Sequence, residues 1–306
     1  MIALSDIHVW QPKSVEDAWK LKAELAADCR IVAGGTLLRT HWQAGSAAMP
    51  RHLVSLDAIP TMRKLEEAQG TAVIGAAVTL AELERHPLIG DRCRPLAAAV
   101  KSIAAPSVRR LATLGGNLVS AVGDTLPALL VTEARLEWYG SEGEELEPVG
   151  SWLERVRSGA APGNRLLIRI HIPIQPLQPR RNPEMSFAFY RKIGRREAFI
   201  PAVVAVAGTG GLAENGKLRN IRLAAGGGAT QAERLTDAEE ILLSDDHWSE
   251  NLPAIHNHIQ RQYQACTDPF RSAEYRRITA ANLITAELWA IANQMGRGET
   301  GYAAYS

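Results

Sequence analysis

The sequence predicts an α/β N-terminal part followed by an α+β C-terminal part. Up to residue 172, segments with apolar residues at helical spacing alternate with short apolar runs that are typical of strands. Residues 173–183 then hold four prolines in eleven positions, which indicates a stiff connection rather than a helix or strand. After this connection the expected strands come first and the expected helices follow. We therefore expect two domains, 1–177 and 184–295, and a C-terminal tail at 296–306.

Capping residues mark the expected helix starts in the N-terminal part. Ser14 with Asp17 three residues later forms a partial capping box, and Thr79 with Glu82 forms a complete one. Helices are expected over 14–27, from 79 to the proline at 87, over 94–103, and from 126 into a strand that ends at 136. The other expected strands are 30–33, 52–56, 71–76 and 165–172, with an exposed hairpin-like turn at 140–147.

The C-terminal part begins with strand signals and ends with helical ones. The expected strands are 186–191, 202–208 and 218–225. The expected helices are 237–243, 251–264 and 279–293. We therefore expect a three-stranded sheet packed against helices in this domain.

The composition is that of an ordinary globular protein. The chain has 306 residues, of which 46% are hydrophobic and 22% charged, and its formal net charge of +1 gives no reason to expect nucleic acid or an anionic membrane as a partner. No apolar stretch approaches the roughly 18 residues of a membrane span, and the N-terminus lacks the features of a signal peptide. We therefore expect a cytoplasmic protein.

The cysteines argue against a metal centre in this chain. Cys29, Cys93 and Cys266 are far apart and cannot supply the four thiolates that an iron–sulfur cluster usually needs. Among the histidines, only His256 and His258 are closely spaced, and on a helix their side chains point in different directions. We therefore expect no metal ligands and, because no triad or carboxylate pair is evident, no catalytic side chain.

Two segments with paired glycines carry the strongest functional signal. Residues 33–38 read Ala-Gly-Gly-Thr-Leu-Leu, and residues 113–118 read Thr-Leu-Gly-Gly-Asn-Leu. Glycine lets backbone N–H groups approach an anion without interference from a Cβ, and Thr36, Thr113 and Asn117 add polar side chains. Each segment alone is typical of a tight turn. Together they suggest two glycine loops that grip a diphosphate from two sides.

Other nucleotide motifs are missing. No Lys-Ser/Thr pair follows the glycines, which excludes a P-loop, and the Gly-x-Gly-x-x-Gly fingerprint is absent. Asp124, a few residues after the second segment, is placed to accept a hydrogen bond from a ribose or ribityl hydroxyl. The arginine-rich segment 191–196 is interpreted as a solvated strand end and turn.

The stretch 103–117, Ile-Ala-Ala-Pro-Ser-Val-Arg-Arg-Leu-Ala-Thr-Leu-Gly-Gly-Asn, resembles a signature of the FAD-binding medium subunits of molybdenum hydroxylases, such as xanthine dehydrogenase and carbon monoxide dehydrogenase. Segments 12–18, 33–36, 191–196 and 272–276 resemble other motifs of the same family, in the family's order. The resemblance implies a two-lobed FAD-binding α/β domain, with lobes at about 1–58 and 59–177, followed by a smaller α+β domain.

The resemblance also implies a set of residues around FAD. The first glycine segment would form one wall of the diphosphate site: Val32, Ala33, Gly34, Gly35, Thr36, Leu37 and Leu38. The second would form the other wall: Thr113, Gly115, Gly116, Asn117, Leu118 and Ser120. Asp124 would lie near the FAD sugar, and Ile103 with Ala104 beside the flavin ring. The chain departs from the family at Leu37, where an acidic residue is common, and in the short stretch between Asn117 and Asp124.

The implied function is electron transfer. FAD would take electrons from a small iron–sulfur partner subunit and pass them to NAD or another acceptor, while substrate is oxidised on a large molybdopterin subunit. Two alternatives remain open from the sequence. One is a free-standing FAD oxidoreductase that turns over an organic substrate, and the other is a non-catalytic scaffold subunit that retains no FAD.

Overall fold

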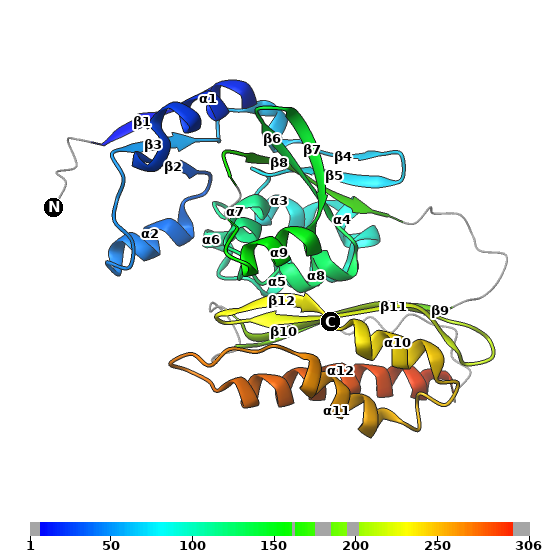
Figure 1. Ribbon diagram of the computed structural model, residues 1–306. Coiled ribbons are helices and arrows are strands. Elements are labelled where there is room, and N and C mark those ends of the chain that lie inside the picture. Colours follow the sequence, from blue (N-terminus) through cyan, green and yellow to red (C-terminus); the bar gives the residue numbers. More distant parts are fainter. Residues whose placement is uncertain (1–6, 161–162, 175–184, 195–201, 296–306) are drawn as a thin grey trace. The chain divides into compact units, whose positions relative to one another are not determined.

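The computed structural model describes residues 7–160, 163–174, 185–194 and 202–295. Most of the proline-rich connection, the expected tail and Arg195 with Arg196 lie outside these residues. The chain forms two compact units, which are described separately; Figure 1 labels their elements. The first unit is built from residues 1–92, 104–121 and 133–174, and the second from residues 93–103, 122–132 and 175–306.

A three-stranded parallel sheet with the order β1-β3-β2 begins the first unit (Figure 1). Its strands are β1 (His8–Trp10), β2 (Cys29–Val32) and β3 (His52–Ser55), connected by helices α1 (Val15–Leu25) and α2 (Thr36–Gln43) and a 3₁₀ turn at Ala26–Asp28. The expected cap of α1 is confirmed, because the Ser14 hydroxyl accepts a 3.0 Å hydrogen bond from the Asp17 N–H. Helix α2 was not expected from the sequence.

An antiparallel five-stranded sheet with the order β4-β5-β8-β6-β7 completes the first unit. The strands are β4 (Leu65–Ala68), β5 (Thr71–Gly75), β6 (Arg135–Gly140), β7 (Gly143–Pro148) and β8 (Leu166–Pro173). Its helices are α3 (Leu80–Arg85), α4 (Pro87–Arg92), α6 (Pro106–Arg109), α7 (Leu114–Val119) and α9 (Val149–Arg157), with a 3₁₀ turn at Pro60–Arg63. The capping box of Thr79 and Glu82 at the start of α3 is confirmed.

The sequence missed the two edge strands of this sheet. The expected hairpin-like turn at 140–147 is confirmed as a hairpin, but most of these residues belong to strand β7 rather than to the turn, and β4 was not expected at all. Both strands are rich in glutamate and largely exposed, so they lack the apolar alternation that identifies a half-buried strand.

The second unit is an antiparallel four-stranded sheet between two groups of helices. The sheet has the order β12-β11-β10-β9, with strands β9 (Met185–Gly194), β10 (Ala202–Leu212), β11 (Leu218–Gly227) and β12 (Thr230–Arg234). The helices are α5 (Arg94–Ser102), α8 (Leu126–Val131), α10 (Thr236–Ser244), α11 (Leu252–Gln262) and α12 (Ala273–Met295). The α+β class is confirmed, but the sheet has four strands rather than the expected three, because β12 is short and follows its partner after a two-residue turn.

Helices α5 and α8 precede the proline-rich connection in sequence but belong to the second unit. Every residue of α8 is buried, and Thr209 of β10 donates a 3.1 Å hydrogen bond to the carbonyl oxygen of Val131. Neighbouring residues of β10, including Val204 and Val206, point instead into the cluster formed with α10, α11 and α12. The two compact units are therefore not separated by a single boundary in the sequence, because the second unit includes segments that precede the proline-rich connection.

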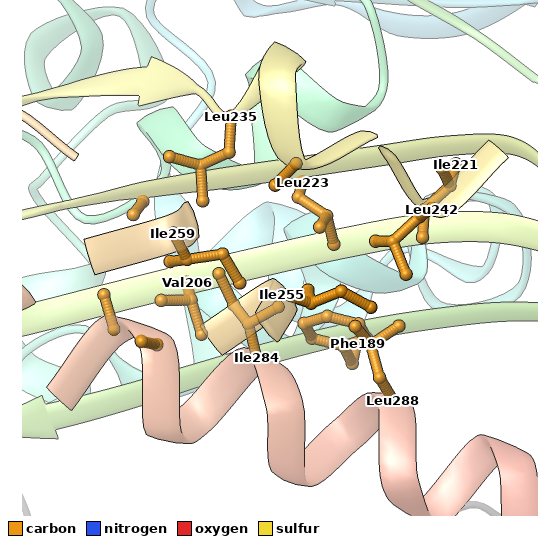
Figure 2. Close-up of a cluster of buried hydrophobic side chains, with 14 of the residues drawn as sticks. Phe189, Val206, Ile221, Leu223, Leu235, Leu242, Ile255, Ile259, Ile284 and Leu288 are labelled. Atoms are coloured by element: carbon orange, nitrogen blue, oxygen red, sulfur yellow. The ribbon is translucent and has the colours of Figure 1, made fainter. Parts of the chain in front are cut away.

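The core of the second unit is the apolar cluster shown in Figure 2. Val206 and Leu223 from the sheet meet Ile259 of α11 and Ile284 of α12, and all four side chains are inaccessible to solvent. Among the described residues, no helix combines the length and apolar character that crossing a membrane would require.

We predict that Ile284→Ala lowers the free energy of unfolding by about 2–5 kcal/mol, because it leaves a cavity that the cluster cannot fill. Ile278→Ala on the same helix is the matched control, since Ile278 is 38% exposed, and it should change stability by no more than about 0.5 kcal/mol. Urea denaturation of the two variants measures the difference. Equal losses of unfolding free energy in the two variants would show that the cluster around Ile284 is not tightly packed.

Two glycines of the first unit lie where one backbone presses against another. A Cβ on Gly34 would overlap the carbonyl group of Leu111, and a Cβ on Gly115 would lie 2.6 Å from the carbonyl oxygen of Ala76. Real Cβ atoms do not come this close to backbone atoms, so these positions require glycine for packing alone.

Gly34→Ala should therefore destabilise the protein in the absence of any ligand, by about 2 kcal/mol or more, because it overpacks a backbone contact that cannot rotate away. Gly90→Ala provides the comparison: Gly90 lies in a helix with nothing near its missing Cβ, so alanine should stabilise by about 0.5–1 kcal/mol. Thermal unfolding of the ligand-free proteins gives the readout. If Gly34→Ala left the melting temperature unchanged, the close backbone contact would be disproved.

Candidate functional site

The first glycine segment leads from a strand into the start of a helix. Strand β2 ends at Val32, and Gly35 adopts a left-handed conformation with φ 64° as the N-cap of α2. No side chain caps this helix, and the first hydrogen bond along it runs from the Arg39 N–H to the Gly35 carbonyl, at 2.9 Å. Within the described part of the chain, the N–H groups of Thr36, Leu37 and Leu38 have no acceptor.

These three donors share the positive end of the helix dipole. A helix N-terminus with open N–H groups is a ready site for an anion such as a phosphate. Gly35 adds no side chain that could block access to it. The first glycine segment thus keeps the chemical character that the sequence predicts, and it gains that character from a helix that the sequence analysis did not identify.

The second glycine segment is the first turn of α7 and not a loop, which corrects the expectation from the sequence. The Thr113 hydroxyl caps it by accepting a 3.0 Å hydrogen bond from the Gly116 N–H. The N–H groups of Leu114 and Gly115 donate to the carbonyls of Val78 and Ala76, each at 3.0 Å. These backbone donors are therefore used inside the protein and are not open to an anion.

The structure brings the two segments together. The backbone at Gly34 packs against Leu111, two residues before the second segment begins. Ala112 in turn accepts a 2.8 Å hydrogen bond from the Leu80 N–H, and Thr113 forms an isolated bridge with Thr79. The residues that lead into α7 are thus fixed on one side by the turn before α3 and contact the start of α2 on the other. In α7 itself, Ser120 donates a 2.7 Å hydrogen bond to the Asn117 carbonyl.

Asp124 lies in the second unit, where its side chain is buried. Its carboxylate pairs with the Lys192 ammonium at 2.7 Å and accepts a 3.2 Å hydrogen bond from the Ala202 N–H. The Tyr190 hydroxyl donates to the Asp124 carbonyl at 2.9 Å. Burial, and then the negative charge of Asp124, raise the pKa of Tyr190 well above its usual value, so the hydroxyl keeps the proton that it donates.

Lys192 is a residue whose role the sequence analysis missed. It lies in the arginine-rich segment that was interpreted as solvated, yet its side chain is only 10% exposed and also donates a 2.9 Å hydrogen bond to the Ser102 carbonyl. Its neighbour Arg191 pairs with Glu287 at 2.6 Å. The expected strand 186–191 ended one residue before Lys192, so the available signal was the alternation of strand residues between opposite faces, continued by one position.

The remaining predicted residues follow α5. Ile103 ends that helix in the second unit and is 8% exposed. Ala104, the next residue, belongs to the first unit and has a positive φ of 46°. The residues of the first unit fit a dinucleotide, because the open N–H groups of α2 suit diphosphate oxygens and glycine leaves the approach clear.

Comparison with known proteins agrees with this chemistry. Residues 5–175 match the family described as the FAD binding domain in molybdopterin dehydrogenase, and residues 188–289 match the CO dehydrogenase flavoprotein C-terminal domain. The carbon monoxide dehydrogenase medium chain of Hydrogenophaga pseudoflava is 32% identical over 164 residues, which span 53% of this chain and 57% of that protein.

Two further similarities extend over nearly the whole chain. The nicotine 6-hydroxylase medium subunit of Paenarthrobacter nicotinovorans is 26% identical over 283 residues, covering 92% of this chain and 95% of that protein. A solved structure of carbon monoxide dehydrogenase from Hydrogenophaga pseudoflava, which lacks the Mo-pyranopterin moiety of its cofactor, superposes with a TM-score of 0.80 and 25% identity over 94% of this chain and 96% of that one. The chain therefore belongs to the family of FAD-binding medium subunits of molybdenum hydroxylases, and its cofactor is FAD.

Proposed function

We propose that this chain is the electron-transfer subunit of a molybdenum hydroxylase-type complex. It would accept electrons from a small iron–sulfur subunit and deliver them to NAD or another acceptor, while a large molybdopterin subunit oxidises the substrate. Bound FAD supplies the redox chemistry, because it can exchange electrons with one-electron and two-electron partners. The three open N–H groups at the start of α2 support the proposal most directly, since they are donors that a diphosphate could use.

The protein's part in this function is to bind and orient the cofactor. We assign the diphosphate to Gly34, Gly35 and the N–H groups of residues 36–38, with the Thr36 hydroxyl as a further donor. From the second glycine segment, the side chain of Asn117 is the proposed contributor, because the backbone donors at its start are already bonded within the protein. Ser120 would contribute only by exchanging its hydrogen bond to the Asn117 carbonyl for one to the diphosphate.

The other contacts are assigned from the family pattern. Ile103 and Ala104 are placed beside the flavin ring, and Asp124 is placed near the FAD sugar. A carboxylate offers about four lone-pair sites, and among the described residues each oxygen of Asp124 has one partner, so the carboxylate keeps the capacity to accept a hydrogen bond from a hydroxyl.

The proposed partners follow from what the chain lacks and from its relatives. Its three cysteines lie apart in the sequence and none is in a disulfide, so they offer no set of four thiolates for a cluster. The relatives named above are medium chains or subunits, a description that indicates assembly with other chains. A xanthine dehydrogenase-like activity is one member of the range that this family covers.

We predict that Leu37→Pro weakens FAD binding by about 10- to 100-fold, because it removes one donor to a charged group. Proline is tolerated in the first turn of a helix, where its missing N–H has no partner within the helix. Leu37→Ala is the matched control, since it removes the 45% exposed side chain but keeps the N–H, and it should change the affinity by less than about threefold. Titration of the ligand-free variants with FAD, followed by flavin fluorescence, compares them. Equal affinities of the two variants for FAD would reject the proposal that the diphosphate binds at the start of α2.

Electron transfer is tested with the complex. The chain is co-expressed with the iron–sulfur and molybdopterin subunits of its source organism, isolated by size-exclusion chromatography, and mixed anaerobically with NADH. Co-elution of three subunits and bleaching of the flavin band would support the proposal with NAD as acceptor. Co-elution without bleaching would point to another acceptor. Turnover of an organic substrate by the lone chain would favour the free-standing oxidoreductase, and a colourless complex would favour the scaffold.

A further inference from the structure

Ala104 has an unusual backbone conformation. Its φ of 46° lies in the left-handed region, which L-residues other than glycine, asparagine and aspartate rarely adopt. It occurs at the connection between α5 and α6, and no acceptor for the Ala104 N–H is found within the described residues. Strained backbone of this kind persists only where the surrounding structure holds it in place.

Arg109 stabilises this conformation through a hydrogen bond to the Ala104 carbonyl group. Its Nη1 donates a 2.7 Å hydrogen bond to the Ala104 carbonyl oxygen. Its Nε and Nη2 bind the two oxygens of Glu84 at 2.9 and 3.2 Å. The guanidinium is a rigid, planar fork, so two bonds to Glu84 fix the direction of the third toward Ala104. Arg109 itself is only 8% exposed.

The arrangement is more elaborate than a turn requires. Glycine at position 104 would adopt a positive φ without support, whereas this chain combines a strained alanine with an ion pair between buried Arg109 and partly buried Glu84. What the ion pair adds is a single orientation of the Ala104–Ala105 peptide, whose carbonyl group Arg109 binds. With the backbone of Ala104 held in its left-handed conformation, the preceding peptide is turned in one direction relative to the clamped one, and that preceding peptide carries the Ala104 N–H.

We propose that Arg109 is a positioning residue for the flavin, acting through the Ala104 carbonyl to orient the Ala104 N–H toward an acceptor atom of the flavin ring. This inference rests on the proposed function, which places Ile103 and Ala104 beside that ring. A fixed donor at the ring stabilises the reduced flavin, which carries more negative charge, relative to the oxidised flavin. Arg109 thereby makes the flavin a better electron acceptor, although it does not contact FAD itself.

The test compares four variants of the full chain, each loaded with FAD: Arg109→Met, Arg110→Met, Ala104→Gly and the double variant Arg109→Met with Ala104→Gly. Arg110 is the matched control, because it is the adjacent arginine and is exposed. The readouts are the dissociation constant of FAD, the visible circular dichroism of the bound flavin, and its midpoint potential.

Arg109→Met should leave the FAD dissociation constant within about fivefold, since the diphosphate site is at α2. It should change the flavin dichroism and shift the ratio of reduced to oxidised flavin about tenfold toward oxidised, which is about 30 mV for a two-electron couple. Arg110→Met should change neither. Adding Ala104→Gly to Arg109→Met should restore part of the shift but not all of it, because glycine adopts the required φ without strain and also samples others.

Unchanged dichroism and potential in Arg109→Met that retains FAD would overturn the inference, and so would a shift that glycine at 104 fails to reduce. If Arg109→Met does not fold, Arg109→Lys replaces it: a single ammonium keeps a charge for Glu84 but cannot bind both partners in this geometry, so a smaller shift in the same direction is expected. Lysine with wild-type dichroism and potential would equally overturn the inference.

Ile103→Ala separates this inference from the proposed function. If the flavin lies beside residues 103 and 104, this variant changes the flavin dichroism. A change with Ile103→Ala but none with Arg109→Met would reject the role of Arg109 and keep the proposed placement of the flavin. No change with Ile103→Ala in a chain that retains FAD would reject the placement, and the role of Arg109 with it.

Discussion

The close approach of two backbones at Gly34 and Leu111 is the constraint on which the site in the first unit depends. It sets the start of α2 beside the residues that lead into α7, because no side chain separates the two segments. Gly115 allows a similarly close approach to the backbone of Ala76. The open N–H groups of α2 gain their surroundings from this contact, so the glycines shape the proposed anion site before any ligand arrives. A glycine of these motifs can therefore be required for backbone packing around the site even where it does not touch the cofactor.

The two glycine segments look alike in sequence, but they differ in whether the backbone N–H groups at the start of the helix are already hydrogen-bonded. At α2 the N-cap is Gly35, which has no side chain to accept a hydrogen bond, and the first-turn donors stay open. At α7 the N-cap is Thr113, whose hydroxyl satisfies the Gly116 N–H, while neighbouring carbonyls satisfy the preceding donors. The difference between the open helix start at α2 and the closed one at α7 is therefore one capping residue and one adjoining chain segment.

Features set by neighbours in sequence could be predicted, and features set by distant partners could not. The cap of α1 at Ser14 and the capping box at Thr79 depend on residues three positions away, and both are confirmed. Lys192 is largely shielded from solvent and contacts Asp124 and Ser102, which lie far from it along the chain, so local composition indicated a solvated segment instead. The second glycine segment was taken for a loop for the same reason, because the carbonyls that bind its donors belong to residues 76–78.

Buried cations that bind main-chain carbonyls recur in both units. Arg109 binds the carbonyl of Ala104, Lys192 that of Ser102, and Arg276 those of Val203 and Gly227. Each cation also pairs with a carboxylate, which offsets the cost of burying its charge. A carbonyl is present whatever side chain a position carries, so these bonds fix the backbone while leaving the sequence around it free to vary. That independence is consistent with a fold that superposes on a relative with a TM-score of 0.80 at only 25% identity.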